Sequence, residues 1–152
     1  MNNNIITVGW CEWVSLPELN LPPIKAKVDT GAKTSCLHAF IVEPYLENDI
    51  EWVRFGMHPH QDDDKTEVYC NAKVEDKRDV TDSGGHRELR YVIKTPIILA
   101  KQQWNIEMTL TNRDSMAFRM LLGRRAMHKR ILVNPTESYL LGHVKKRRKI
   151  ES

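Results

Sequence analysis

Hydrophobic and polar residues alternate along much of the chain, which is the pattern of half-buried β-strands. The clearest case runs from Ile24 to Val28, where apolar and basic side chains alternate until the strand reaches Asp29-Thr30-Gly31, a group that favours a turn. Comparable segments recur between turn signals, so the pattern predicts many short strands. We predict the further strands at residues 5–16 with a kink near Gly9, 35–42 ending at Pro44, 50–57, 66–74, 89–99, 104–110, 117–122 and 131–133.

The segments between these strands carry turn and loop signals. Residues 17–23 contain a Pro-Pro pair and are predicted to form a turn, whereas residues 58–65 form a polar loop with an acidic run. Residues 75–86 are highly charged and contain Ser83-Gly84-Gly85, which predicts an exposed, mobile loop. Pro96 interrupts the strand at 89–99 and indicates an edge or a bend there, and we expect a hairpin to 104–110 across residues 101–103.

One helix of one to two turns is predicted at residues 124–130, directly after Gly123. Many short strands, regular turn signals and a single helix predict an all-β barrel. The length of 152 residues is that of one domain with a real hydrophobic core. We assign this domain to residues 1–142 and a basic C-terminal tail to residues 143–152.

Composition narrows the class of protein. Hydrophobic residues make up 41% of the chain and charged residues 28%, as in ordinary globular proteins, and no apolar run is long enough to span a bilayer. The first residues lack the pattern of a secretory signal. Cys11, Cys36 and Cys70 are odd in number and have no CxxC spacing, which is typical of reduced thiols. We therefore expect a cytoplasmic protein that does not associate with a membrane.

Asp29 is the strongest candidate for chemistry, because a rigid strand can aim an acid at its end into a cleft. Thr30 adds a hydroxyl that can hydrogen-bond backbone across an interface. Gly31 lets a substrate or other backbone approach the carboxylate closely. The alternative is an aspartate that caps a turn and has no catalytic function.

Two motifs carry a resemblance to a known class of enzymes. Val28-Asp29-Thr30-Gly31-Ala32 resembles the catalytic motif of retropepsin-type aspartic proteases, and Met120-Leu121-Leu122-Gly123-Arg124 resembles their second signature. From about residue 8 to residue 142, the chain resembles a bacterial and archaeal family of small retropepsin-like endopeptidases. Members have often been labelled "ATP-dependent zinc protease", and some lie beside ligases that add glutamate tails. The segments that carry this wider resemblance are 12–19, 25–32, 104–107, 109–113 and 118–124.

The resemblance implies a closed barrel of the acid-protease type, with one short helix after Gly123. Aspartic proteases use two facing carboxylates, and the chain contains one Asp-Thr-Gly, so the second Asp29 would come from the other subunit of a two-fold homodimer. The implied catalytic residues are Asp29, Thr30 and Gly31, supported by Ala32, Leu121, Leu122, Gly123 and Arg124.

Basic residues gather near both motifs, and we expect Lys33, Arg113 and Arg119 to bind substrate. Such a rim would attract an acidic peptide or protein, and the link to glutamate ligases makes a glutamate-tailed substrate a candidate. The alternative is a solvated surface with Arg124 bracing the fold internally.

The label "ATP-dependent zinc protease" can be compared with the zinc-binding and ATP-binding motifs that the sequence contains. No HExxH pair and no Walker-type phosphate loop occurs, so we expect neither a metal nor another cofactor, and any link to ATP would come from a partner such as a glutamate ligase. The remaining zinc alternative would use the spaced pairs Cys36/His38 and His58/His60.

Two non-enzymatic alternatives also remain. The tail at residues 145–149 could bind nucleic acid, but no aromatic residue interleaves its charges, so nucleic acid is not the expected partner. The other is a non-catalytic adaptor with the same barrel, in which Asp29→Asn would change no measurable property.

Overall fold

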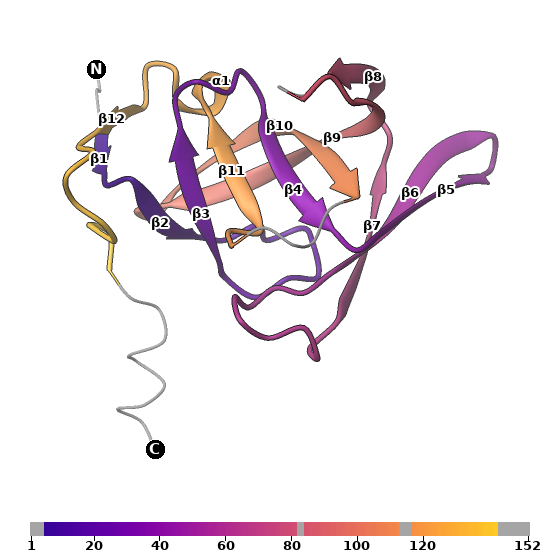
Figure 1. The fold of residues 1–152 in the computed structure, drawn as a ribbon, viewed down its shortest axis with the longest axis horizontal. Helices are drawn as coiled ribbons and strands as arrows, with labels where there is room; N and C mark the ends of the chain where they lie inside the picture. Colours follow the sequence, from indigo (N-terminus) through magenta and orange to yellow (C-terminus); the bar gives the residue numbers. More distant parts are fainter. Residues whose placement is uncertain (1–4, 82–83, 113–116, 143–152) are drawn as a thin grey trace.

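The computed structural model describes residues 5–81, 84–112 and 117–142, and these residues form β-strands and one short helix (Figure 1). The predicted mostly-β class is therefore confirmed. The strands are β1 (Ile6–Val8), β2 (Cys11–Val14), β3 (Ile24–Asp29), β4 (Ser35–Ala39), β5 (Ile41–Glu47), β6 (Ile50–Met57), β7 (Val68–Lys73), β8 (Asp76–Thr81), β9 (Arg87–Leu99), β10 (Gln102–Asn112), β11 (Met120–Gly123) and β12 (Ile131–Val133), and the helix is α1 (Arg124–Met127). The predicted C-terminal tail lies outside the described residues.

A seven-stranded sheet with the order β2-β3-β11-β4-β10-β9-β8 forms the body of the molecule. In this sheet β11 lies between β3 and β4, parallel to the first and antiparallel to the second. An isolated bridge also joins Ser15, just after β2, to Ile98 of β9, with N–H···O distances of 3.3 and 2.9 Å. This bridge links the end of β2, at one edge of the sheet, to β9 near the other edge. Closure of the sheet into a barrel remains a prediction.

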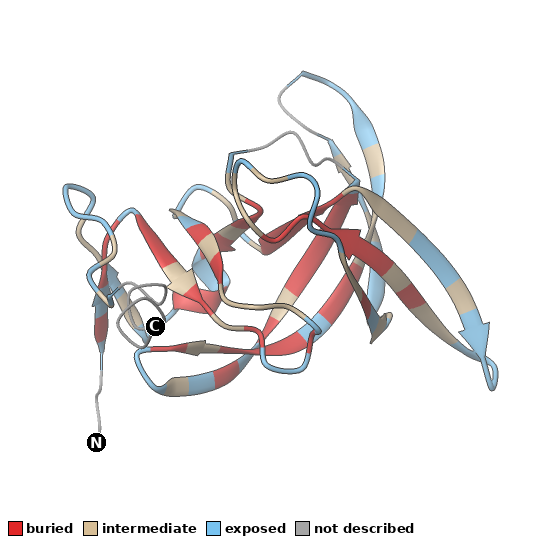
Figure 2. Ribbon diagram, turned by 90° about the horizontal axis from the view of Figure 1, so that it is seen from below, coloured by how far each residue is buried: buried red, intermediate tan, exposed pale blue. Residues whose placement is uncertain are grey.

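The core lies within this sheet because its strands point apolar side chains inward. Ile24 and Ala26 of β3 are fully buried, as are Leu37 of β4 and Met108 of β10. Burying one such large side chain contributes roughly 1.5–3 kcal/mol. Figure 2 shows buried residues concentrated along the central strands, whereas the outer half of the projecting β5–β6 hairpin is exposed.

The expectation of a mobile loop at residues 75–86 is wrong for residues 76–81. These residues form β8, which pairs antiparallel with β9 from Asp76↔Val92 to Thr81↔Arg87. The strand lies at the edge of the sheet, where charged side chains discourage pairing with another chain. Its residues are charged on both faces, so the alternation of apolar and polar residues that marks a half-buried strand is missing.

Two prolines lie inside strands rather than at their ends. The single strand predicted at 35–42 is wrong: it is divided at residue 40 into β4 of the seven-stranded sheet and β5 of the three-stranded sheet β5-β6-β7. Pro44 lies within β5 rather than ending it, and β5 is an edge strand, where a missing N–H is tolerated. Strand β8 pairs with β9 only as far as Val92, so Pro96 has a paired neighbour on one side, in β10, and none in β8. This agrees with the predicted edge position. The β9–β10 hairpin turns at Ala100-Lys101, which have φ values of 51° and 69°, one residue earlier than predicted.

The other predictions of local structure agree with the fold. The kink near Gly9 separates β1 from β2, and the segment at 131–133 forms β12, which pairs parallel with β1. The predicted helix is present as the four residues of α1. Among the described residues, no helix has the length and apolar character that a membrane span requires.

Candidate active site

Asp29 is the last residue of β3 and is partly exposed. The backbone N–H of Gly31 donates a hydrogen bond of 3.0 Å to Oδ1 of Asp29, and the N–H of Ala32 donates one of 3.1 Å to the Asp29 carbonyl. These two bonds close the turn and orient the carboxylate. Thr30, between them, is exposed.

Gly123 brings the second motif against the first. It pairs with Asp29 in the parallel register of β11 and β3, and its N–H donates a hydrogen bond of 3.0 Å to Oγ of Ser35. A Cβ atom at this position would lie 2.6 Å from the carbonyl carbon of Thr34. Only glycine therefore allows this close approach of β11 to the start of β4.

Arg124 contacts the turn at residues 29–32 directly. Its Nη1 donates hydrogen bonds of 3.2 Å to the Gly31 carbonyl and 3.4 Å to the Thr30 carbonyl, and its backbone N–H donates one of 2.9 Å to the Ala32 carbonyl. Leu122 of β11 is buried and pairs with Val28, so the apolar part of the second motif lies alongside β3. Leu121 pairs with Lys27 in the same register. The two signatures that the sequence analysis found separately thus form one structure.

The three predicted substrate-binding residues are placed differently. Lys33 is exposed beside the turn, and its carbonyl accepts a hydrogen bond of 3.1 Å from the N–H of Arg125. Arg119 is only 7% exposed, which favours a structural position over one on the rim of a cleft. Arg113 lies outside the described residues.

Sequence reasoning gave no role to Ser35, although this residue holds the site together. Ser35 is buried, its Oγ accepts from Gly123, and its carbonyl accepts a hydrogen bond of 3.3 Å from Oγ1 of Thr109. Ser35 begins a strand whose five residues are all buried, and no local pattern in the sequence indicates its contact with Gly123.

Glu12 is a second residue whose position sequence reasoning missed. It is buried, and its Oε2 accepts hydrogen bonds from the N–H groups of Gly9 at 2.8 Å and Leu140 at 2.9 Å, while Oε1 accepts from Leu141 at 3.1 Å. This carboxylate fastens the segment after β12 to β2. The sequence feature that could have indicated its burial is an acidic residue within the otherwise apolar strand β2.

Cys11, Cys36 and Cys70 are buried, and none of these three described residues forms a disulfide. Burial raises the pKa of Cys70 to about 11, and burial is also the main cause of a raised pKa at Cys11. Burial, followed by a hydrogen bond with Cys11, raises the pKa of Tyr139 to about 12. The thiols of Cys11 and Cys70 are therefore protonated near neutral pH and serve as packing groups.

The donors of the zinc alternative do not converge. Cys36 and His38 are buried in β4, while the His58 ring stacks on Phe40 at a centroid distance of 4.5 Å, and its Nδ1 lies 3.3 Å from the Thr66 carbonyl. Within the described ranges, no group of three or more His, Cys, Asp or Glu side chains is arranged to hold a metal ion. The donors present thus do not match the three or four ligands of a zinc site.

Comparison with known proteins identifies the family. A model of the RimB-like family, described as "Retropepsin-like aspartic endopeptidase RimB", matches residues 7–143. The chain belongs to the RimB-like family. The predicted resemblance is thereby confirmed, and it covers the strand, turn and helix that form the candidate site.

Curated relatives of this RimB-like chain have a different name. The chain is 49% identical over 139 residues to a "Probable alpha-L-glutamate ligase" of Desulfotalea psychrophila (strain LSv54 / DSM 12343), which covers 91% of this chain and 30% of that protein. It is 46% identical over 142 residues to a protein of the same name from Shewanella pealeana (strain ATCC 700345 / ANG-SQ1), covering 93% of this chain and 31% of that protein. The chain thus spans somewhat less than a third of the length of these relatives.

A solved structure shares the fold. The crystal structure of Lpg0085, a protein with unknown function (DUF785) from Legionella pneumophila subsp. pneumophila str. Philadelphia 1, matches with a TM-score of 0.73 and 26% sequence identity. The match covers 90% of this chain and 98% of that chain.

Proposed function

We propose that the chain is a homodimeric aspartic endopeptidase in which two Asp29 carboxylates, one from each subunit, activate a water molecule. The observation that carries this proposal is the fixed, partly exposed Asp29 at the end of β3, oriented by the Gly31 N–H at 3.0 Å. The Arg124 guanidinium and Gly123 hold the same turn from a distant part of the chain. Membership in a family named for an aspartic endopeptidase supports the same reaction.

The dimer is proposed because the reaction needs two carboxylates. The chain has one Asp-Thr-Gly, so a pair of facing aspartates requires a second copy related by a two-fold axis. Two carboxylates about 3 Å apart cannot both be ionised, so they share one proton. Thr30 is exposed, so its hydroxyl would be available for a hydrogen bond across such an axis.

The reaction follows from this shared proton. The ionised carboxylate takes a proton from water as the water oxygen attacks the scissile carbonyl carbon, and the protonated carboxylate donates to the carbonyl oxygen. The tetrahedral diol then breaks at its C–N bond: the carboxyl group that took the proton from water protonates the leaving amine, and the other carboxylate takes a proton from a diol hydroxyl. The products are a carboxylic acid and an amine, and the pair regains one proton.

Acidic peptides are the proposed substrate class, and glutamate-tailed proteins are the specific candidate. The exposed Lys33 and Lys27 flank the catalytic turn and would attract negative charge. Relatives that contain a matching segment are named as probable glutamate ligases, which supports a link between adding and removing glutamate. The free cysteines support a reducing, cytoplasmic location.

The test is Asp29→Asn, which removes the titrating acid and nearly preserves its shape. Peptides ending in several glutamates are incubated with each protein, and the products are identified by mass spectrometry. We expect hydrolysis by the parent chain and none by Asp29→Asn, with unchanged circular dichroism.

Asp49→Asn is the matched control, since Asp49 lies in the exposed β5–β6 turn with φ 65°, a conformation that asparagine tolerates. Full activity of Asp29→Asn would contradict an aspartic mechanism.

A further inference from the structure

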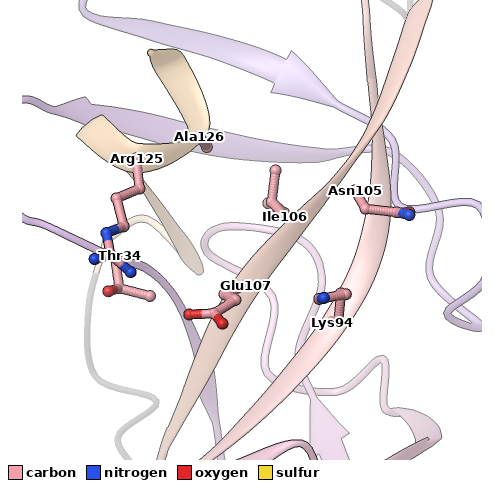
Figure 3. A pocket seen from close by; sticks show the side chains of 7 residues that line it. All are labelled: Thr34, Lys94, Asn105, Ile106, Glu107, Arg125 and Ala126. Carbon is pink, nitrogen blue, oxygen red and sulfur yellow. The ribbon is translucent and has the colours of Figure 1, made fainter.

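A cavity of about 260 Å³ lies beside the segment that follows the catalytic turn. It opens between the start of β4, the β9–β10 hairpin and α1 (Figure 3). Ile106 and Ala126 supply its apolar surface. The polar side chains that line it are Thr34, Lys94, Asn105, Glu107 and Arg125.

The walls of this cavity are fixed by hydrogen bonds. Nε1 of Trp104 in β10 donates to the Ala126 carbonyl at 3.1 Å, which holds α1 against β10. The N–H of Arg125 donates to the Lys33 carbonyl at 3.1 Å, which holds α1 against the catalytic turn. The cavity is therefore formed before any ligand arrives, and Thr34, which follows the active-site turn, forms part of its wall.

The charges in the cavity are unbalanced. Glu107 lies directly opposite Lys94 in the β9–β10 register, but its Oε1 accepts a hydrogen bond of 3.1 Å from Nη2 of Arg78 instead. The side chains of Lys94 and Arg125 form no ion pair with any residue in the described part of the chain. Figure 3 shows these two cationic side chains on either side of Glu107. Arg78 also donates from Nε to Oδ2 of Asp76 at 2.9 Å, so its guanidinium is shared between two carboxylates. The two cations and one carboxylate that line the cavity, together with Arg78 and Asp76, therefore carry one net positive charge.

We infer that this cavity binds a carboxylate, supplied by an acidic side chain of a peptide or by a free acidic amino acid. An arginine guanidinium binds carboxylates with two parallel hydrogen bonds, and a lysine adds a second positive charge. The Thr34 hydroxyl and the Asn105 amide are further donors. The volume is slightly below the roughly 300–1,000 Å³ of pockets for drug-sized ligands, which suits one acidic side chain.

The position of the cavity near the catalytic turn suggests a function in substrate binding. An acidic segment held there would lie next to the catalytic turn, so the cavity would be an exosite for acidic substrates. That use rests on the proposed peptidase function, whereas carboxylate binding itself does not. Binding is therefore measured without hydrolysis, in the Asp29→Asn protein.

The experiment follows backbone amide chemical shifts of ¹⁵N-labelled Asp29→Asn protein during titration with triglutamate, triglutamine or free glutamate. Both tripeptides are amidated at the C-terminus, so that the triglutamine peptide carries no carboxylate. We expect triglutamate to shift the amides of Thr34, Asn105 and Glu107, and triglutamine to leave them unchanged. Adding Lys94→Ala together with Arg125→Gln should weaken triglutamate binding at these amides by about tenfold, or about 1.4 kcal/mol. Lys73→Ala, which removes an exposed lysine from β7, is the matched control and should not alter the affinity.

The outcomes separate the two sources of the carboxylate. Tighter binding of triglutamate than of free glutamate identifies a peptide segment as the ligand, and equal binding identifies the free amino acid. Equal shifts with triglutamine, or unchanged binding after both substitutions, would overturn the inference. Because no step requires hydrolysis, an inactive enzyme with intact triglutamate binding would contradict only the proposed function.

Discussion

Gly123 lies directly opposite Asp29 in the parallel pairing of β11 with β3, although the two residues are far apart in the chain. The N–H of Gly123 donates a hydrogen bond to Ser35 of β4, so β11 connects the strand before the Asp29 turn to the strand after it. Arg124, the next residue, bonds to the carbonyl groups of the turn itself. The position of the Asp29 carboxylate therefore depends on a glycine in another motif.

We predict that Gly123→Ala destabilises the protein and lowers its peptidase activity. The added methyl group would meet Thr34 backbone at 2.6 Å, and backbone cannot move aside as a flexible side chain can. Overpacking of this kind costs about 1–3 kcal/mol in the free energy of unfolding, measured by urea denaturation. Lys73→Ala, in an exposed position, should stay within about 0.5 kcal/mol of the parent. Unchanged stability of Gly123→Ala would contradict the close approach.

Glu88 predicts a dependence of stability on pH. Burial alone would raise the pKa of Glu88, but hydrogen bonds from Arg90, Asn112 and Thr111 outweigh it and lower the pKa. A lowered folded-state pKa means that the ionised carboxylate stabilises the fold above its ordinary pKa of 4.5. This stabilisation is lost as the pH falls through the folded-state pKa.

The measurement compares the parent with Glu88→Gln by urea denaturation from pH 7 downward. We expect the difference in unfolding free energy to be constant near neutral pH and to shrink below the ordinary glutamate pKa of 4.5. Glu47→Gln, at an exposed position in β5, should show no such trend. A difference that grows on acidification would show that the sign of the Glu88 contribution is wrong.

Much of the fold follows from local patterns in the sequence. Alternation in residues 24–28 and the turn chemistry of Asp29-Thr30-Gly31 are short-range signals, and the structure contains the strand and turn that they predict. The strand β8 has no such signal because both of its faces are solvated and charged. The turn at Ala100-Lys101 lacks the glycine or asparagine that usually marks a two-residue hairpin loop.

The site was less predictable because its contacts join distant segments. Nothing near Ser35 in the sequence indicates that its hydroxyl accepts from Gly123, since that pairing depends on the order of strands in the sheet. The burial of Arg119 likewise depends on how β4 and β11 pack. No local pattern within one chain indicates a second Asp29, so the proposed dimer rests on the need of the reaction for two carboxylates.

We predict that peptidase activity survives prolonged treatment with a chelator. In the proposed reaction the Asp29 pair, and no cation, activates the water. The measurement is hydrolysis of a glutamate-tailed peptide before and after dialysis against EDTA, with the metal content followed by mass spectrometry. Activity lost to the chelator and restored by zinc alone would support the zinc alternative, with Cys36, His38 and the loop at 58–65 as the first residues to test.

The last prediction concerns the sharing of one site by two subunits. If each site needs Asp29 from both chains, a heterodimer of parent and Asp29→Asn chains should be inactive. Random pairing in an equal mixture leaves about a quarter of the dimers with two aspartates. The activity per parent chain should therefore fall to about half of its value without the variant, once the mixture has exchanged subunits. Asp49→Asn chains, mixed in the same way, should cause no loss. Activity that stays proportional to the number of parent chains, in a mixture shown by native mass spectrometry to contain heterodimers, would mean that each Asp29 acts without its counterpart.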